Sequence, residues 1–377
     1  MSFAEECCLS LGKQACRAAV RVRRGSVVHF SRLVSRIGGS MKAAVLKSLG
    51  PVSNASLQLV DVMTPTPARG QVLIKVLACG VCRSNLHMIE GDWAPNTPAR
   101  LPIIPGHEVV GEIVELGPEV AWLSVGDRVG VQPIFSTCGR CDYCVTGREQ
   151  LCGAKQVTGE TVDGGYAEYM LAEAAYAYVL PAGLSDLEAA PLFCPGITAF
   201  ASASKARLEP GMSVAVFGVG GVGHLVIQMA GLWGTRVSAV SGSQIHQELA
   251  EELGAAVIDA HRDPVGVLLR RGGVDASIVF APSSIAVAQA VAVTRRGGTI
   301  VVGVHAEVGA LPFDQEKTVV GSLLGTRRQM REVLELADAG KIRTECEAFP
   351  LEGAVEALVR LKRGKVRGRA VIAPAGC

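Results

Sequence analysis

The pattern of apolar and polar positions divides the chain into two parts of different character. From Met41 to about Leu192 the apolar runs are short and are interrupted by glycine and proline, as at 72–77, 109–114 and 128–131. Runs of this length bounded by turn residues are typical of β-strands. We therefore expect a β-rich region that presents functional side chains on its loops.

The second part, from about Pro195 to Gly325, alternates strand-like and helix-like segments. The strand at 214–217 leads into a glycine-rich turn and a helix, and the strand at 237–240 leads into a helix over 247–253. This alternation predicts a parallel, doubly wound sheet, and hence an α/β fold. The later segments are strands at 276–280, 299–302 and 318–324, helix-like sequence at 286–293, and, after Arg327, a helix, a short strand, a helix and a last strand at 368–372.

Residues 1–40 differ from the rest of the chain. They hold seven Lys or Arg residues against Glu5 and Glu6. Arg-rich, acid-poor composition is typical of an organelle-targeting segment. Because the acids lie at the very start, we favour a poorly ordered N-terminal extension, with the folded domain beginning at Met41.

Composition excludes several classes of protein. The 377 residues are 49% hydrophobic and 19% charged, with a net charge of +2, which argues for two globular domains and against a nucleic-acid partner. The uncharged stretch from Pro210 to Thr235 is interrupted by glycines, so we expect a phosphate-binding turn and no membrane partner. Twelve cysteines, six of them in metal-ligand patterns, indicate a reducing compartment. We expect the cytoplasm, with organelle targeting through residues 1–40 as the alternative.

Four cysteines form the strongest single motif, and their thiolates can close a tetrahedral shell around a structural zinc ion. An iron–sulfur cluster is the rival, but the longer last gap and the missing Cys-Pro ending disfavour it. A group of free thiols is the remaining alternative. The four are Cys138, Cys141, Cys144 and Cys152.

A second metal set comprises Cys82, His107 and Cys194. A catalytic zinc ion needs three protein ligands and an open position, and two cysteines with one histidine are a known set. Taken alone, Cys194 could be an apolar core thiol and His107 a core histidine. Glu108 beside the histidine could tune the metal or only hydrogen-bond its ligands. Near Cys82, Ser84 and His87 offer groups that transfer protons.

A glycine fingerprint follows the strand at 214–217 and opens a helix. It permits a tight turn and close approach of a pyrophosphate to the helix N-terminus. The next strand ends in Ser241-Gly242-Ser243, with no carboxylate to repel a 2′-phosphate, so NADP is favoured over NAD. Arg236 and His246 are the nearby cationic candidates. The fingerprint glycines are Gly218, Gly220, Gly221 and Gly223.

From Met41 to about Pro374 the chain resembles the zinc-dependent medium-chain alcohol dehydrogenases of bacterial and archaeal type. The resemblance rests on the two cysteine sets, the glycine fingerprint, and the motifs at 78–82, 106–108, 164–169 and 325–327. It implies a GroES-like β-rich catalytic domain at 41–194 and 327–377, around a Rossmann domain at 195–326. The implied assembly is a homotetramer, with a dimer as the alternative.

The implied reaction is hydride transfer between a primary or secondary alcohol, or the corresponding aldehyde or ketone, and NAD(P). The resemblance implies two zinc ions per chain and a proton path from Ser84 to His87. Trp93 and Ile134 would line the substrate pocket, and Arg83 and Arg369 would lie near the cofactor phosphates. A catalytically weak zinc- and nucleotide-binding protein with a structural or sensing role is the alternative.

Asn85 departs from the family, which usually has Asp at this position. An amide keeps a hydrogen bond but lacks the charge that orients a metal ligand. From sequence alone we therefore expect lower activity or a shifted pH profile relative to an Asn85→Asp variant. Asn85 is also the only sequence support for the weak-binder alternative.

Overall fold

The computed structural model describes residues 39–92 and 100–374. The expectations for the N-terminal extension and for Trp93 therefore fall outside the described residues, except at 39 and 40. No helix in the described ranges has both the length and the apolar character needed to cross a membrane. The uncharged stretch at 210–235 instead contains a five-residue strand, the glycine turn and a ten-residue helix.

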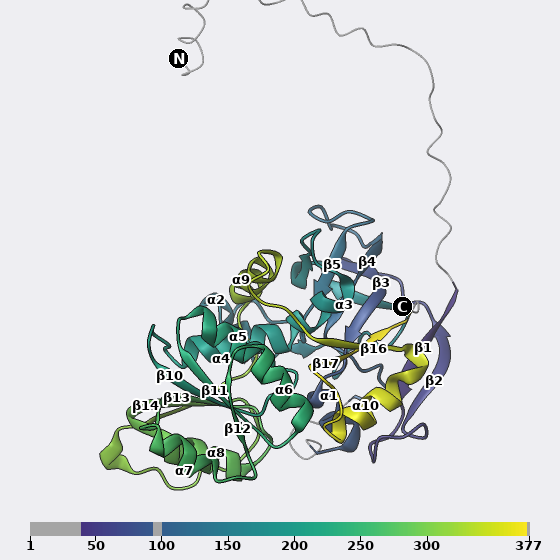
Figure 1. Ribbon diagram of the computed structural model, residues 1–377. Coiled ribbons are helices and arrows are strands. Elements are labelled where there is room, and N and C mark those ends of the chain that lie inside the picture. The colour runs from purple at the N-terminus through teal and green to yellow at the C-terminus, as the bar shows by residue number, and fades with distance from the viewer. Residues whose placement is uncertain (1–38, 93–99, 375–377) are drawn as a thin grey trace, which may run out of the picture. The chain divides into compact units, whose positions relative to one another are not determined.

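Strands are the main regular elements of the first part of the chain, as the short apolar runs predicted (Figure 1). The strands are β1 (Ser40–Leu46), β2 (Leu57–Met63), β3 (Gln71–Gly80), β4 (Val109–Leu116), β5 (Arg128–Val131), β6 (Ile134–Ser136), β7 (Gln156–Val157), β8 (Tyr169–Glu173), β9 (Ala177–Val179), β10 (Ser213–Phe217), β11 (Arg236–Ser241), β12 (Ala256–Asp259), β13 (Val274–Val279), β14 (Thr294–Val302), β15 (Thr318–Gly321), β16 (Cys346–Pro350) and β17 (Arg369–Ala373).

Helices are concentrated in the second part. The α-helices are α1 (Arg83–Glu90), α2 (Asp142–Val145), α3 (Asp186–Ala189), α4 (Pro195–Lys205), α5 (Gly223–Leu232), α6 (Gln244–Glu252), α7 (Pro264–Arg270), α8 (Ser284–Val293), α9 (Arg327–Asp338) and α10 (Ala354–Lys362). Short 3₁₀ turns are η1 (Glu149–Leu151), η2 (Ala174–Tyr176), η3 (Ala190–Phe193), η4 (Phe313–Gln315) and η5 (Leu351–Gly353).

The second part forms a six-stranded sheet in the order β12-β11-β10-β13-β14-β15. All of its strand pairs are parallel. The chain order reverses between β10 and β13, and the crevice at the carboxyl ends of two such strands is where dinucleotides bind in doubly wound folds. The predicted fold class is confirmed. The strand expected at 318–324 is shorter than predicted, because β15 ends at Gly321.

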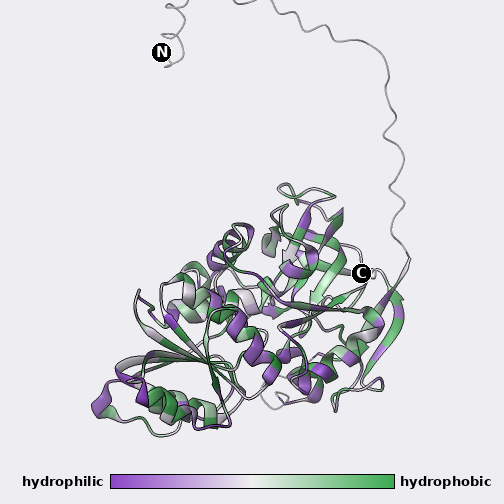
Figure 2. Ribbon diagram, viewed as in Figure 1, coloured by the Kyte–Doolittle hydropathy of each residue, from purple (hydrophilic) through white to green (hydrophobic). Residues whose placement is uncertain are grey.

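Most strands of this sheet read as nearly continuous apolar runs, because helices cover a parallel sheet on both faces. In β10, Val214 to Phe217 are all buried. Figure 2 shows these strands mainly in the hydrophobic colour, whereas hydrophilic residues lie along α6. Two strands differ, since only Ile258 of the four residues of β12 is buried and no residue of β15 is buried. No strand was predicted from the sequence at β12.

The first part is organised around β3, the ten-residue strand at the centre of a seven-stranded sheet. The sheet order is β16-β17-β3-β4-β5-β9, and β8 pairs with β3. Val72, Leu73 and Ile74 are completely buried. Since β17 comes from the C-terminal end of the chain and pairs with Cys79 and Gly80, it brings Arg369–Ala373 beside the end of β3.

Candidate active site

Three segments far apart in the sequence meet at the end of β3. Cys82, His107, Glu108 and Cys194 are all buried, and one ligand atom from each lies within 4.8 Å of the others. Two thiols, an imidazole and a carboxylate in one buried place suit a borderline-soft divalent ion such as Zn²⁺. The structure thus brings Cys82, His107 and Cys194 together with Glu108, which the sequence also indicated as a site residue.

Local backbone features place each of these side chains. Cys82 is the N-cap of α1, and its N–H donates to Asn85 Oδ1 at 3.3 Å. Cys194 lies between η3 and α4, where Pro195 starts the new helix. Gly80 is required for the packing, because a Cβ there would lie 1.9 Å from Glu108 Oε2.

The two active-site thiols share a hydrogen bond, with their Sγ atoms 3.8 Å apart. This bond lowers the pKa of Cys82 far below its usual value and raises that of Cys194. Burial lowers the pKa of His107, but the charge and hydrogen bond of Cys82, together with the charges of Glu108 and Glu160, outweigh burial and raise the pKa. The site therefore concentrates negative charge at Cys82, which suits a bound cation.

Glu108 and Arg369 form a buried ion pair whose side chains are 0% and 3% exposed. Arg369 Nε donates to Glu108 Oε2 at 3.1 Å, and a second guanidinium nitrogen donates to Oε1. Burial raises the pKa of Glu108 to about 7, although Arg369 opposes the change. Arg369 thus compensates the charge of the carboxylate beside the thiols.

The predicted proton-transfer groups lie on α1. Ser84 Oγ is 3.3 Å from His107 Nε2, so it faces the buried set directly. The His87 side chain is 29% exposed, and its Nδ1 lies 2.6 Å from Asp92 Oδ2. Arg83 donates to the carbonyl of Leu361 at 3.3 Å, and burial lowers its pKa.

His107 has two neighbours on its other edge. Asn85 Nδ2 is 3.4 Å from Nδ1, and Glu160 Oε1 is 3.9 Å from the same nitrogen. Burial raises the pKa of Glu160, and the charge of His107 opposes this. Sequence reasoning found Asn85 but missed Glu160, because Glu160 belongs to no motif and lies far along the chain.

The four remaining metal-pattern cysteines form a separate cluster at α2 and η1. Their Sγ atoms all lie within 4.8 Å of one another. Two backbone N–H groups, those of Arg140 and Cys141, lower the pKa of Cys138 to about 6. Four thiols at this spacing fit a closed tetrahedral zinc shell.

The glycine fingerprint lies at the point where the strand order of the parallel sheet reverses. Gly218 has a φ of +92°, and a Cβ there would lie 2.6 Å from the backbone nitrogen of Ala281, just after β13. Gly223 opens α5, and a Cβ there would lie 1.9 Å from the carbonyl oxygen of Gly218. A Cβ at Gly220 would have no described atom within 4 Å, which is consistent with a turn that a pyrophosphate can approach closely.

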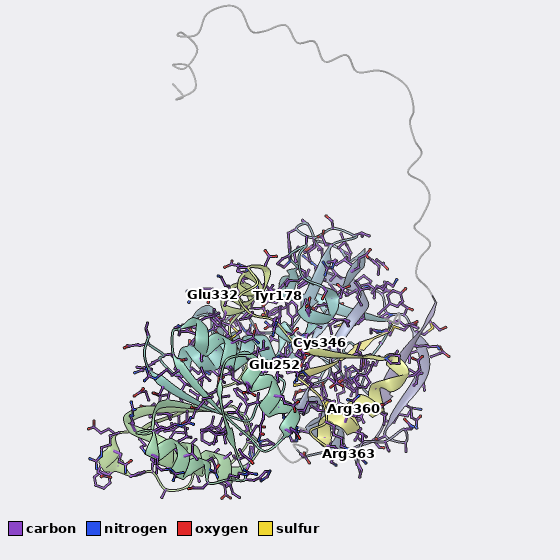
Figure 3. The ribbon with its side chains drawn as sticks, viewed as in Figure 1. Tyr178, Glu252, Glu332, Cys346, Arg360 and Arg363 are labelled. Carbon is purple, nitrogen blue, oxygen red and sulfur yellow. The ribbon has the colours of Figure 1, made fainter. Side chains whose placement is uncertain are left out.

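Arg369 connects this turn to the metal-ligand set. A Cβ at Gly221 would lie 2.3 Å from a guanidinium nitrogen of the same Arg369 that pairs with Glu108. The segment before β17 is anchored to α6, because Glu252, labelled in Figure 3, forms an ion pair with Arg367. His246 Nε2 lies 3.0 Å from the carbonyl oxygen of Val366.

Of the residues expected at the end of β11, the two serines lie there and Arg236 does not. Ser241 is buried, its Oγ accepts from the N–H of Ser243 at 3.3 Å, and Ser243 is the N-cap of α6. Arg236 was wrongly placed here, because it starts β11 and donates to Ser213 at the opposite end of the strand. A strand of this length separates it from Ser241 by roughly 17 Å.

Sequence reasoning missed His261 at this end of the sheet. A Cβ at Gly242 would lie 2.5 Å from His261 Nε2. His261 follows β12, which pairs with β11 in parallel, so the carboxyl ends of both strands share an edge. A correct strand prediction at β12 would have indicated this neighbour.

Of the two predicted pocket residues, Ile134 is 1% exposed and begins β6, and Trp93 lies outside the described residues.

A buried thiol–imidazole–carboxylate set beside a dinucleotide turn defines a class of protein, the metal-binding, nucleotide-binding oxidoreductases. Residues 68–182 match the family described as alcohol dehydrogenase GroES-like domain, and residues 221–339 match the zinc-binding dehydrogenase family. An alcohol dehydrogenase of Geobacillus stearothermophilus is 42% identical over 340 residues, which is 88% of this chain and 99% of the relative.

Solved structures give the same result. The alcohol dehydrogenase of the archaeon Aeropyrum pernix is 35% identical with a TM-score of 0.82, covering 88% of this chain and all of its own. A chain from Sinorhizobium meliloti bound to NADP is 29% identical with a TM-score of 0.80, over 89% of this chain and 100% of the relative. The chain belongs to the zinc-dependent medium-chain alcohol dehydrogenase family.

Proposed function

We propose that this chain catalyses hydride transfer between a primary or secondary alcohol and NAD(P), and the reverse reduction of aldehydes or ketones. The observation that carries the proposal is the position of Arg369. Its guanidinium pairs with Glu108 of the buried ligand set and also packs closely against Gly221 of the dinucleotide turn. A metal site and a nicotinamide site would therefore adjoin.

Cys82, His107 and Cys194 would hold the catalytic zinc ion, and Glu108 beside them would tune it. When bound, zinc lowers the pKa of a substrate hydroxyl and the nicotinamide accepts the hydride. The thiolate character of Cys82 prepares the site for a cation. The four cysteines at 138, 141, 144 and 152 would hold the structural zinc ion.

The chain's own residues would move the proton. Ser84 has its hydroxyl beside His107 Nε2 and would accept the proton of the alcohol. His87, one turn further along α1 and partly exposed, would release it to solvent. Trp93 and Ile134 would line the substrate pocket.

We propose NADP as the preferred cofactor, with Gly218, Gly220, Gly221 and Gly223 around the pyrophosphate and Arg83 and Arg369 near it. Ser241 and Ser243 offer hydroxyls for a 2′-phosphate, and His261 adjoins Gly242. The carboxylate of Asp259, opposite Ser241, lies 3.4 Å from Arg262 Nε, so a positive charge compensates it.

The domain division at 41–194 with 327–377, and 195–326, is supported by strand membership. Every strand of the parallel sheet falls within 195–326. We further propose that the protein is cytoplasmic and forms a homotetramer, with a dimer as the alternative. Light scattering of the purified protein tests the oligomeric state.

The proposed function is tested by zinc analysis together with NADPH and NADH oxidation on a panel of aldehydes and ketones. We expect two zinc ions per chain, rapid turnover, and a higher kcat/KM with NADPH than with NADH. Zinc and cofactor binding without turnover on any substrate would favour the weak-binder alternative. A preference for NADH would overturn only the cofactor assignment.

A further inference from the structure

We propose that Glu160 is the carboxylate that orients His107 for metal binding, so that a residue from a different segment supplies the charge that Asn85 lacks. The inference rests on the proposed zinc site. It makes Glu160 a positioning residue, since it acts through the imidazole. It also changes what the Asn85 substitution means for this protein.

The two ring nitrogens of His107 have different surroundings. Nε2 lies 3.3 Å from Ser84 Oγ and 4.0 Å from Glu108 Oε1, on the side of the buried ligand set. A metal at this set would therefore take the lone pair of Nε2. The proton of the neutral imidazole must then sit on Nδ1, which needs a hydrogen-bond acceptor.

Asn85 does not offer that acceptor in its observed orientation. Its Oδ1 accepts from the N–H of Cys82 at 3.3 Å and from the hydroxyl of Tyr166 at 3.4 Å. Its Nδ2 therefore faces His107 Nδ1 at 3.4 Å, and an amide N–H₂ only donates. Flipping the amide would turn Nδ2 toward the backbone N–H of Cys82, which is also a donor. An Asn85 amide held in this orientation points a donor at His107 Nδ1, so it cannot accept a hydrogen bond from an N–H on that nitrogen.

Glu160 offers the hydrogen-bond acceptor that the Asn85 amide does not. Its Oε1 lies 3.9 Å from His107 Nδ1, within about 1 Å of hydrogen-bonding distance. The side chain is 17% exposed, and among the described residues its only ion pair is with His107. The charge of Lys155 also acts on this carboxylate. Because the carboxylate is largely buried, little water screens its attraction for an N–H on His107 Nδ1.

Backbone contacts fix the two residues relative to each other. Gly159 has a φ of +74°, and a Cβ there would lie 2.6 Å from the nitrogen of Gly106, the residue before His107. The N–H of Gly164 donates to Ile104 at 2.7 Å, and that of Gly165 donates to Gly106 at 3.0 Å. The turn that carries Glu160 is thus docked against the segment that carries His107.

The test measures how fast a chelator removes the zinc ion held at Cys82, His107 and Cys194. This ion is identified as the one that a Cys194→Ser variant lacks. We expect Glu160→Gln to accelerate this release by about 10- to 100-fold, because partners of metal ligands contribute that much to affinity. Release of the other zinc ion should not change. The matched control is Glu332→Gln, which removes the same charge from the surface of α9, where Glu332 pairs with Arg328 (Figure 3).

A rescue experiment distinguishes loss of the carboxylate charge from a general disturbance of the structure. In the Glu160→Gln background, Asn85→Asp should return the release rate to near the wild-type value, since it restores a carboxylate at Nδ1. Asn85→Asp alone should change the rate little. An unchanged rate in Glu160→Gln, or an accelerated rate that Asn85→Asp does not rescue, would overturn the inference. Wild-type protein with no Cys194-dependent zinc would instead overturn the proposed function.

Discussion

At the scale of single residues, the site is built from charges that compensate one another inside the protein. Glu108 and Arg369 are nearly inaccessible to solvent, and each is the ion-pair partner of the other. Removing one partner of a buried pair leaves an uncompensated charge, which costs far more than the pair itself contributes. Arg369 therefore matters for folding as well as for the site.

We expect Arg369→Met to destabilise the protein by about 3–5 kcal/mol, because Glu108 loses its partner in a buried place. Urea unfolding followed by circular dichroism measures the change. An Arg369→Met, Glu108→Gln double variant should recover part of the loss, because neither charge of the buried pair then remains. A single variant as stable as the wild type would contradict this account.

Ser84 provides a second prediction at this scale. Ser84→Ala should lower kcat about 10²- to 10⁴-fold, the usual contribution of proton transfer. Zinc content should stay at the wild-type level, since Ser84 is outside the ligand set. Ser84→Thr keeps the hydroxyl and should restore most of the activity. Loss of zinc in Ser84→Ala would show that the hydroxyl acts on the metal site instead.

At the scale of elements, the turn between β10 and α5 joins the parallel sheet to the metal site. Its glycines have different functions. Gly223 packs against the carbonyl of Gly218 within the turn, whereas no atom of residues 39–92 or 100–374 lies within 4 Å of a Cβ at Gly220. Only Gly223 is needed for the fold itself, and Gly220 keeps space for a ligand.

Gly220→Ala and Gly223→Ala should therefore separate stability from cofactor binding. In Gly223→Ala the new methyl group clashes with backbone, so we expect a loss of about 1–3 kcal/mol together with weak cofactor binding. In Gly220→Ala we expect a wild-type melting temperature but weaker binding of NADPH. Thermal unfolding and fluorescence titration measure the two effects. Equal NADPH affinity in Gly220→Ala and wild type would place the pyrophosphate elsewhere.

At the scale of the whole molecule, two metal sites with different tasks are expected in one chain. The ligand set at Cys82 is buried, whereas three cysteines of the other cluster, Cys138, Cys141 and Cys144, are partly exposed. The segment between β6 and β7 that carries these cysteines contributes little to the core, because only Gln150 and Cys152 of its residues are buried. A closed metal shell would supply the stability that this segment lacks.

Cys144→Ser should remove one of the two zinc ions and lower the melting temperature, while the zinc ion at the Cys194 site remains. Metal analysis and calorimetry check both effects. Cys346→Ser is the control, because Cys346 (Figure 3) belongs to neither set and donates to the carbonyl of Leu187. If Cys144→Ser keeps two zinc ions, the four-cysteine assignment is wrong.

Much of this protein could be predicted from local sequence. The period of apolar residues predicted the parallel sheet at 213–321, and the glycine spacing predicted the turn after β10. Residue types and spacing also indicated the four-cysteine set before any distance was known. These features are encoded locally, because strand, turn and helix preferences act over a few residues.

The tertiary structure decided what depends on contacts between distant segments. The direction of β11 places Arg236 at its first residue, at the end of the strand opposite Ser241, where it had been expected. The pairing of β11 with β12 brings His261 beside Gly242. Above all, sequence presented Asn85 as a missing charge, while folding brings Glu160 to within 3.9 Å of His107. The physical reason is that backbone packing between two distant loops sets this distance, and no local preference in either loop encodes it.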